Sequence, residues 1–258
     1  MPGYSPLLAL PTLLERRNRL TWCTEHRAMP TKPLPVTLVI PCRNEARNLE
    51  SLLPQVQGLT EELIIVDGHS ADNTRELSLE HGATYVLDNR MGKGDALRVG
   101  IARATKDICV FIDADLSHDA ADIPRLVAPI LDGRADMVLG SRMRGCIDEF
   151  IATFMELIRL AGNMGLTWLI NLRCGSKLSD SQNGFRAVRT DLLRSLNLNS
   201  VKHTIELEMT MRALRKKARV VEVATHESCR RYGQSSLSVA HQGVLFLWFY
   251  LRECVRPV

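Results

Sequence analysis

The sequence predicts an α/β fold with a mostly parallel central sheet flanked by helices. Three apolar segments with strand character, Val36–Ile40, Leu63–Val66 and Ile108–Ile112, each lead directly into polar residues. Helical patterns separate these segments, and alternating strands and helices imply right-handed crossovers and parallel pairing. Residues 108–112 are apolar throughout, as expected of a strand that is buried on both faces of a sheet.

We expect three regions along the chain. Residues 1–35 form an irregular, proline-rich arm with one helix over Leu13–His26, and we expect this arm to pack on the core or on a partner. Residues 36–240 form the main α/β domain. Residues 241–258 form an apolar C-terminal segment.

Each strand of the main domain ends at a turn signal. Pro41 ends the first strand, and Asp72 and Asn73 are placed to cap the helix after the second strand. In chain order we expect a strand over 36–40, a helix that Arg43 or Asn44 precedes and that runs through Leu53, and a strand over 63–66. A helix to about 81, a strand over 84–87 and a helix over 95–104 follow. We then expect a strand over 108–112, a helix beyond Pro124 and a strand over 137–139.

Two apolar segments follow the main strand–helix series. The interior of Phe150–Leu172 carries Glu156, Arg159 and Asn163, which favours an amphipathic helix over a membrane-inserted one. Val244–Leu251 is too short to cross a bilayer, since a spanning helix needs roughly 20 apolar residues. We rank first a role in which this segment closes the core or contacts a partner. The alternative is that it lies in a membrane interface.

Composition narrows the classes of function. A formal charge of +4 suits an anionic substrate or an acidic membrane face, and no motif for binding nucleic acid is present. The seven cysteines include no Cys-x-x-Cys pair, which argues against a zinc site or a disulfide framework and fits a reducing compartment. No basic region precedes Leu7–Leu14, so we expect no signal peptide. We therefore expect a cytoplasmic protein, soluble or peripheral at a membrane, that binds no nucleic acid.

The strongest chemical signal is Asp113-Ala114-Asp115, at the end of an apolar strand. Residues two apart in an extended segment point to the same side, so both carboxylates can face one ligand. A divalent cation carrying a diphosphate would relieve their repulsion, and Mg²⁺ or Mn²⁺ suits such oxygen ligands better than zinc. Ser117 or His118 could complete the shell. Asp-x-Asp also occurs as a solvated loop or a helix cap, so the motif alone does not decide.

The ordered motifs resemble those of a known enzyme family. No Gly-x-Gly-x-x-Gly follows the first strand, which disfavours a dehydrogenase. The set resembles the inverting family 2 glycosyltransferases of GT-A (Rossmann-like, nucleotide-sugar-binding) fold, and within them the dolichyl-phosphate (polyprenyl-phosphate) mannosyltransferases. The motifs that carry this resemblance, which extends from about Val36 to Leu237, are Pro41-x-x-Asn44-Glu45, Val66-Asp67-Gly68-x-Ser70, Gly92-Lys93-Gly94, Asp113-Ala114-Asp115-Leu116-Ser117-His118, Gly140-Ser141-Arg142, Asp180-x-x-x-Gly184-Phe185-Arg186, Glu206-Leu207-Glu208-Met209, Glu222-Val223 and Arg230-Arg231-Tyr232-Gly233-Gln234-Ser235.

The resemblance implies a metal-dependent transfer of a sugar from GDP-mannose to a polyprenyl phosphate. It also implies a form of the enzyme that is peripheral at a membrane and that can use a small membrane protein as partner. It places the metal on Asp113, Asp115 and Ser117. The implied nucleotide-sugar-binding residues are Pro41, Arg43, Glu45, Asp67, Lys93 and Asp113. The implied catalytic residues are Asp115, Arg142 and Arg230, and the implied acceptor-binding residues are Arg142, Arg230, Arg231, Ser235, Asp180 and Glu206.

An acceptor phosphate is already ionised at neutral pH and needs positive charge rather than a general base. A hydroxyl acceptor would need a base, and Asp180 or Glu206 would be the candidates.

Departures from the family pattern keep alternatives open. Members usually have Tyr in place of Arg43 and Asp in place of Gly68, in the nucleotide pocket. Ser236, Gln182 and Asn183 also differ from the usual residues on the acceptor side. The first alternative is a family 2 enzyme with a hydroxyl acceptor on a soluble metabolite, glycan or protein. The second is a non-catalytic GT-A scaffold, which the retained Asp113 and Asp115 disfavour.

Overall fold

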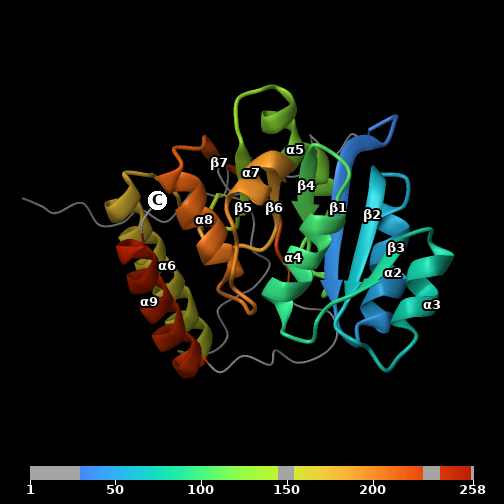
Figure 1. The fold of residues 1–258 in the computed structure, drawn as a ribbon, viewed down its shortest axis with the longest axis horizontal. Helices are drawn as coiled ribbons and strands as arrows, with labels where there is room; N and C mark the ends of the chain where they lie inside the picture. Colours follow the sequence, from blue (N-terminus) through green and yellow to red (C-terminus); the bar gives the residue numbers. More distant parts are fainter. Residues whose placement is uncertain (1–29, 145–153, 229–238, 257–258) are drawn as a thin grey trace, which may run out of the picture.

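The computed structural model describes residues 30–144, 154–228 and 239–256, and it confirms the α/β fold (Figure 1). Most of the expected arm, including the helix over 13–26, lies outside these residues. The elements are β1 (Leu34–Cys42), α2 (Ala46–Val56), β2 (Thr60–Asp67), α3 (Thr74–Glu80), β3 (Thr84–Leu87), α4 (Lys93–Arg103), β4 (Ile108–Phe111), the 3₁₀ turn η1 (Ala120–Asp122), α5 (Ile123–Leu131), β5 (Met137–Ser141), α6 (Phe154–Cys174), β6 (Arg186–Arg189), α7 (Thr190–Ser195), α8 (Ile205–Arg215), β7 (Val220–Ala224) and α9 (Val239–Val255).

The described strands form one sheet in the order β3-β2-β1-β4-β6-β5-β7. All neighbouring pairs are parallel except the two that involve β6, which runs antiparallel to both β4 and β5. The carboxyl ends of β1, β2, β4, β5 and β7 therefore meet at the same edge of the sheet. This is the edge where open α/β sheets bind ligands.

Helices cover both faces of the sheet because β1 alternates its side chains between them. Val36, Leu38 and Ile40 pack with α2 and α5, whereas Val39 packs with α4. Helix α4 approaches β1 so closely that a Cβ on Gly100 would lie 2.4 Å from Cγ1 of Val39. Helices α7 and α8 extend the second layer.

Helices α6 and α9 lie side by side beyond α8 (Figure 1). Phe249 and Tyr250 of α9 are buried with Leu166 and Ile170 of α6, so α9 contributes to a core, as ranked first. The opposite side of α9 is apolar and exposed, and Trp248 keeps 56% of its surface accessible. Among the described helices, none combines the length and the apolar character needed to cross a membrane.

The expected end of the first strand at Pro41 was wrong, and β2 and β5 also extend beyond their expected bounds. Strand β1 continues through Pro41 to Cys42, because Pro41 and Cys42 still pair with Val66 and Asp67 of β2. The carbonyl of Val39 accepts from the backbone N–H of Ile112, and this is the last contact of β1 with β4. The nitrogen of Pro41, two positions after Val39, points to the same side of β1 as the carbonyl of Val39. Because β4 no longer pairs with β1 at this position, the missing N–H of the proline costs no ladder hydrogen bond.

Candidate active site

The site forms where the carboxyl ends of the strands meet. Asp67 ends β2, Asp113 follows β4, and Arg142 follows β5, so the fold brings together residues that are far apart in sequence. The site contains a cluster around Lys93 and a loop after β4. We expect the nucleoside on the side near β1 and β2, called the nucleoside side, and the acceptor on the side near β5 and β7, called the acceptor side.

Lys93, at the start of α4, lies between two carboxylates. Its Nζ is 2.7 Å and 3.0 Å from the two oxygens of Asp113 and 2.8 Å from Oε1 of Glu206. All three side chains are largely buried. Burial opposes the charge on Lys93, but Asp113 and Glu206 outweigh it and raise the pKa of this lysine. Likewise, burial alone would raise the pKa of Asp113, but Lys93 and then His118 hold it below its usual value.

Glycines allow the Lys93 cluster to close. A Cβ on Gly184 would lie 3.0 Å from Oδ2 of Asp113 and 3.1 Å from Nζ of Lys93. A Cβ on Gly94 would lie 2.5 Å from the carbonyl oxygen of Ser200, so the N-terminus of α4 fits against the loop before α8 only without a side chain. No role for Gly184 is predicted from the sequence. Its place in the Asp-x-x-x-Gly-Phe-Arg motif is the feature that could have indicated one.

The loop after β4 turns sharply at Leu116, where φ is +62°. The hydroxyl of Ser117 donates to Oδ1 of Asp115 at 2.6 Å, and its backbone N–H donates to the same oxygen at 3.1 Å. The ring of His118 stacks on Phe185 with centroids 5.1 Å apart. Burial lowers the pKa of His118 to about 4 against the opposing charges of Asp113 and Asp115, so this histidine is neutral at pH 7.

Asp113, Asp115 and Ser117 supply only oxygen atoms, which is the donor set that Mg²⁺ and Mn²⁺ prefer. Asp115 is partly exposed. Both oxygens of Asp113 already contact Lys93. The described residues hold no group of three or more His, Cys, Asp or Glu side chains arranged to bind a metal. The donor set suits such an ion, and the assignment of a metal to these residues stays a prediction.

Asp67, on the nucleoside side, is buried and accepts several hydrogen bonds. Tyr85 donates its hydroxyl to Oδ2 at 2.6 Å, and Ser70 donates its hydroxyl to Oδ1 at 2.5 Å. Burial and then the hydrogen bond to Asp67 raise the pKa of Tyr85 above its usual range. Both oxygens of Asp67 already accept from Ser70 or Tyr85, and its contact with a nucleotide base stays a prediction.

The loops after β1 and β2 are bonded together. The backbone N–H of Asn44 donates to Oγ of Ser70 at 2.7 Å, and its side chain accepts from the N–H of Ala71 at 2.8 Å. Glu45 precedes α2 and accepts from the side-chain amide of Asn48. Pro41, Arg43 and Glu45 all lie at this end of β1, as the nucleoside-pocket prediction requires.

Two departures from the family pattern contact each other. A Cβ on Gly68 would meet the Cβ, Cγ and Cδ of Arg43 at 3.2–3.4 Å. The stem of Arg43 therefore occupies the space beside residue 68. An aspartate there, as in most family members, would require this arginine to move.

Arg142 and Asp180 form a bidentate ion pair on the acceptor side. Nε and Nη2 of Arg142 donate to the two oxygens of Asp180 at 2.6 Å and 2.9 Å. Nε also lies 3.4 Å from Oε2 of Glu227. Burial opposes the charge on Arg142, but Asp180 and then Glu227 raise its pKa.

Glu222 holds the segment that carries Asp180. Its Oε1 accepts from the backbone N–H groups of Ser179 and Asp180, both at 2.7 Å, and its Oε2 lies 3.0 Å from Nε of Arg144. The sequence reading noted Glu222 only as part of a motif. Glu208 instead accepts from the backbone N–H groups of Asn199 and Ser200, and thus supports the loop against Gly94 rather than the site itself.

Three expected acceptor residues, Arg230, Arg231 and Ser235, lie outside the described residues. Their roles stay predictions. Of the other expected site residues, the structure joins Lys93, Asp113 and Glu206 in one cluster and Arg142 with Asp180 in another.

Comparisons with known proteins identify the family of this chain. Residues 37–196 match the model of Glycosyl transferase family 2. An uncharacterized glycosyltransferase of Mycobacterium tuberculosis is 32% identical over 208 residues, which cover 81% of this chain and 92% of that protein. Dolichol-phosphate mannosyltransferase of Pyrococcus furiosus is 32% identical over 213 residues, which cover 78% of this chain and 59% of that protein.

Solved structures share the fold. Glucosyl-3-phosphoglycerate synthase from Mycobacterium tuberculosis, in complex with Mn²⁺, uridine diphosphate and glucosyl-3-phosphoglycerate, superposes with a TM-score of 0.66 at 22% identity and covers 88% of this chain and 82% of that one. The complex of the same enzyme with Mg²⁺ and uridine diphosphate gives a TM-score of 0.66 at 23% identity, covering 100% and 86% of the two chains. The fold of this chain is therefore GT-A.

Proposed function

Because this chain belongs to glycosyltransferase family 2, we propose that it transfers a hexose from a nucleoside diphosphate sugar, with inversion, onto the phosphate of a polyprenyl phosphate. The proposed donor is GDP-mannose. This donor and acceptor are supported by the ordered motifs and by the 32% identity with the dolichol-phosphate mannosyltransferase of Pyrococcus furiosus.

The observation that carries the choice of acceptor is the pairing of both candidate bases with cations. Asp180 is held by Arg142 and Glu206 by Lys93, in largely buried surroundings. Taking a proton from a hydroxyl acceptor would break one of these ion pairs. A phosphate acceptor is already ionised and needs no base, while Arg142 can supply the positive charge that it requires.

The proposed metal is Mg²⁺ or Mn²⁺, bound by Asp115 with Asp113 and Ser117 beside it. Such an ion would stabilise the charge that develops on the leaving diphosphate. Support comes from the all-oxygen donor set and from the Mn²⁺ and Mg²⁺ complexes of glucosyl-3-phosphoglycerate synthase. Lys93 would assist by moving from Asp113 towards the diphosphate, which would leave a carboxylate oxygen for the ion.

A lipid acceptor places the enzyme at a membrane surface, and we propose that α6 and α9 contact it. Trp168 and Leu172 of α6 and Trp248 and Leu251 of α9 are 56–70% exposed. The acidic side chain of α9, Glu253, is buried against Arg212, so the exposed side of this helix is apolar. Arg173, Arg252 and Arg256 add positive charge suited to anionic lipids. A small membrane protein that presents the acceptor would meet the same surface.

A hydroxyl acceptor on a soluble phosphorylated metabolite is the second candidate. The observation that favours it is the fold shared with glucosyl-3-phosphoglycerate synthase in complex with UDP-glucose and phosphoglyceric acid. In this case Arg142 would bind the phosphate of the acceptor, and Asp180 or Glu206 would have to act as base.

The test is a panel of donors and acceptors. GDP-mannose, UDP-glucose and UDP-GlcNAc are incubated with Mn²⁺, with and without polyprenyl phosphate or 3-phosphoglycerate, and both donor binding and nucleotide release are measured. We expect release of GDP that depends on the lipid phosphate. Release that depends on phosphoglycerate would favour the second candidate, and failure to bind any donor would favour a non-catalytic scaffold.

A further inference from the structure

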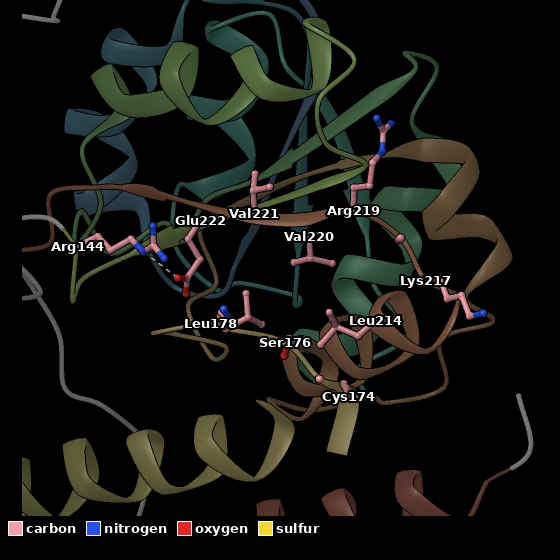
Figure 2. A pocket seen from close by; sticks show the side chains of 13 residues that line it. Arg144, Cys174, Ser176, Leu178, Leu214, Lys217, Arg219, Val220, Val221 and Glu222 are labelled. Atoms are coloured by element: carbon pink, nitrogen blue, oxygen red, sulfur yellow. Dashed lines mark ion pairs between the residues drawn. The ribbon is translucent and has the colours of Figure 1, made fainter. Parts of the chain in front are cut away.

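A groove of about 590 Å³ runs along the outer edge of β7 (Figure 2). We call it the β7 groove: it lies between Val220–Glu222, the turn after α8, and residues 174–178 at the end of α6. Strand β7 is the edge strand of the described sheet, so no further strand covers this side. The volume falls within the range of about 300–1,000 Å³ that is typical of ligand pockets. Nothing in the chemistry of the Lys93 or Arg142 clusters uses the β7 groove.

The β7 groove has an apolar floor and a cationic rim. Leu178, Leu214 and Val220 contribute apolar side chains on one side of β7, as Figure 2 shows. Lys177 and Lys217 are exposed at the rim. Arg219 also lines it, but its charge is countered by a bidentate contact with Asp136. An apolar floor below cationic side chains suits an amphipathic anion, whose apolar part is buried while its anionic part stays near the rim.

One end of the β7 groove adjoins the acceptor side of the active site. Arg144 lies at this end and contacts Glu222, as the dashed line in Figure 2 marks. Glu222 in turn binds the backbone N–H of Asp180, whose carboxylate holds Arg142. A ligand whose phosphate contacts Arg142 could therefore extend its remaining part past Arg144 into the groove.

The other end of the β7 groove meets the exposed apolar side of α6. Cys174 lines the groove and is the last residue of α6. Leu172 and Trp168, two residues and six residues earlier in the helix, are 70% and 63% exposed. The groove therefore ends at the helix that we place at the membrane surface.

We propose that the β7 groove binds the isoprenoid tail of the acceptor next to its phosphate. This inference rests on the proposed function. The phosphate lies at Arg142, the first isoprene units pass Arg144, and the following units lie over Leu178 and Leu214 towards Cys174. Lys177 and Lys217 keep their charged ends in water above the tail. The β7 groove therefore selects acceptors by the length and apolar character of the chain attached to the phosphate.

The test introduces a bulky side chain at the far end of the groove. Ser176 is half-buried and donates its hydroxyl to Asn171. Ser176→Trp should fill the groove near Cys174 but leave the Arg144 end open. We expect KM for a long-chain polyprenyl phosphate to rise about tenfold with little change in kcat. This is the result when a mutation removes binding energy that is the same in the ground state and the transition state. KM for geranyl phosphate, which reaches only the Arg144 end, should stay within about twofold.

Ser195→Trp is the matched control, because Ser195 is an exposed serine whose hydroxyl bonds to a backbone carbonyl and it does not line the groove. It should leave both KM values unchanged. Leu214→Gln, which makes the floor polar, should repeat the effect of Ser176→Trp. Unchanged KM for the long-chain acceptor in both groove variants, or equal increases for both acceptors, would overturn the inference.

A binding measurement separates this inference from the proposed function. Farnesyl phosphate is titrated into the full chain in a calorimeter, without donor. Binding that Ser176→Trp weakens and Ser195→Trp retains supports the β7 groove even if no sugar is transferred, in which case the proposed function fails alone. Transfer to lipid phosphate with no effect of Ser176→Trp on binding or KM overturns the groove and leaves the proposed function standing.

Discussion

Lys93 is the residue that joins the loop after β4 to α8 within the site. It contacts Asp113, which follows β4, and Glu206, in the first turn of α8. The lysine cation counters one of the two negative charges in this largely buried cluster, and removing it would leave both carboxylates without their cation. The same contacts place a cation beside the proposed diphosphate site.

We expect Lys93→Met to lower the free energy of unfolding by about 3 kcal/mol near pH 7, since breaking a buried ion pair typically costs this much. The pH dependence should also change. In the native protein the lowered pKa of Asp113 contributes stability above its usual value of 3.8, and this is lost as the pH falls through the lowered pKa. Without Lys93, burial should raise that pKa, so the variant should lose stability as the pH rises above about 4.

Urea unfolding at several pH values checks this expectation. Lys93→Arg keeps a cation between the carboxylates and serves as the control. It should lower the free energy of unfolding by less than half as much as Lys93→Met. If the free energy of unfolding depends on pH in the same way in the native protein and in Lys93→Met, the cluster contributes no pH-dependent stability.

Asp115 is the second residue-scale prediction. We expect Asp115→Asn to reduce turnover at least about a hundredfold, because an amide is a much weaker metal ligand than a carboxylate. The fold should persist, since its described hydrogen bonds are local ones with Ser117. Nucleotide release across a Mn²⁺ titration measures the effect. Asp119→Asn, in the same loop, should keep activity within about twofold and lose only part of a helix cap. Full activity of Asp115→Asn would refute the metal assignment.

At the scale of these residues, the sequence indicated the members of the site but not their partners. Asp113 and Asp115 could be found because an apolar strand runs directly into them. The contact of Lys93 with Glu206 joins residues 113 positions apart, from two helices, and depends on how α4 and α8 dock. Such pairs follow from tertiary packing, which spacing along the chain does not encode.

Close packing between α4 and β1 is the main determinant at the scale of elements. Gly100 lets the helix lie directly on Val39, in the strand that leads into the nucleoside side of the site. The position of Lys93, seven residues earlier in α4, depends on this contact. The packing of α4 on β1 therefore sets both the stability of the core and the geometry of the cluster around Lys93.

We expect Gly100→Ala to destabilise the protein by about 1–3 kcal/mol, because the added methyl group would overlap Cγ1 of Val39. Gly162→Ala is the matched control: it lies in α6 with nothing within 4 Å of the added Cβ, and alanine favours a helix by up to about 1 kcal/mol over glycine. Chemical denaturation should therefore give opposite changes for the two variants. Equal stability of both would mean that α4 can move away from β1 without cost.

The elements that could be predicted differ from those that could not by their hydrophobic pattern. The strand over 84–87 has the bounds expected, and the strands before Asp67 and Asp113 were apolar runs bounded by turn signals. Strand β6 begins with the buried Arg186 and ends with Arg189, which hides its strand character. Helix α8 buries Glu206, Glu208 and Arg212, so its apolar periodicity is interrupted by charges that are satisfied only in the folded protein.

At the scale of the whole molecule, the catalytic edge of the sheet and the helix pair α6–α9 form two distinct regions joined by α8. Leu207 and Met211 of α8 pack on α6 and α9, while Glu206 of the same helix contacts Lys93. Arg212 binds Glu253 of α9 at 3.0 Å and is buried with it. This arrangement fixes the exposed side of α6 and α9 relative to the active site, as a membrane-bound acceptor would require.

The proposed membrane surface gives the last prediction. We expect the full chain to sediment with vesicles that contain anionic lipid, and to do so more weakly as salt rises, because arginines near a charged bilayer contribute about 1 kcal/mol each. Trp168→Gln together with Leu172→Gln should weaken this binding at least about tenfold, since both side chains are exposed and apolar. Leu79→Gln together with Leu131→Gln, which changes two similarly exposed apolar residues on the helices of the opposite layer, is the control and should leave binding unchanged. Equal loss in both double variants would indicate non-specific adhesion. Sedimentation of neither native protein nor variants would place the acceptor in solution, and transfer would then have to proceed without a membrane.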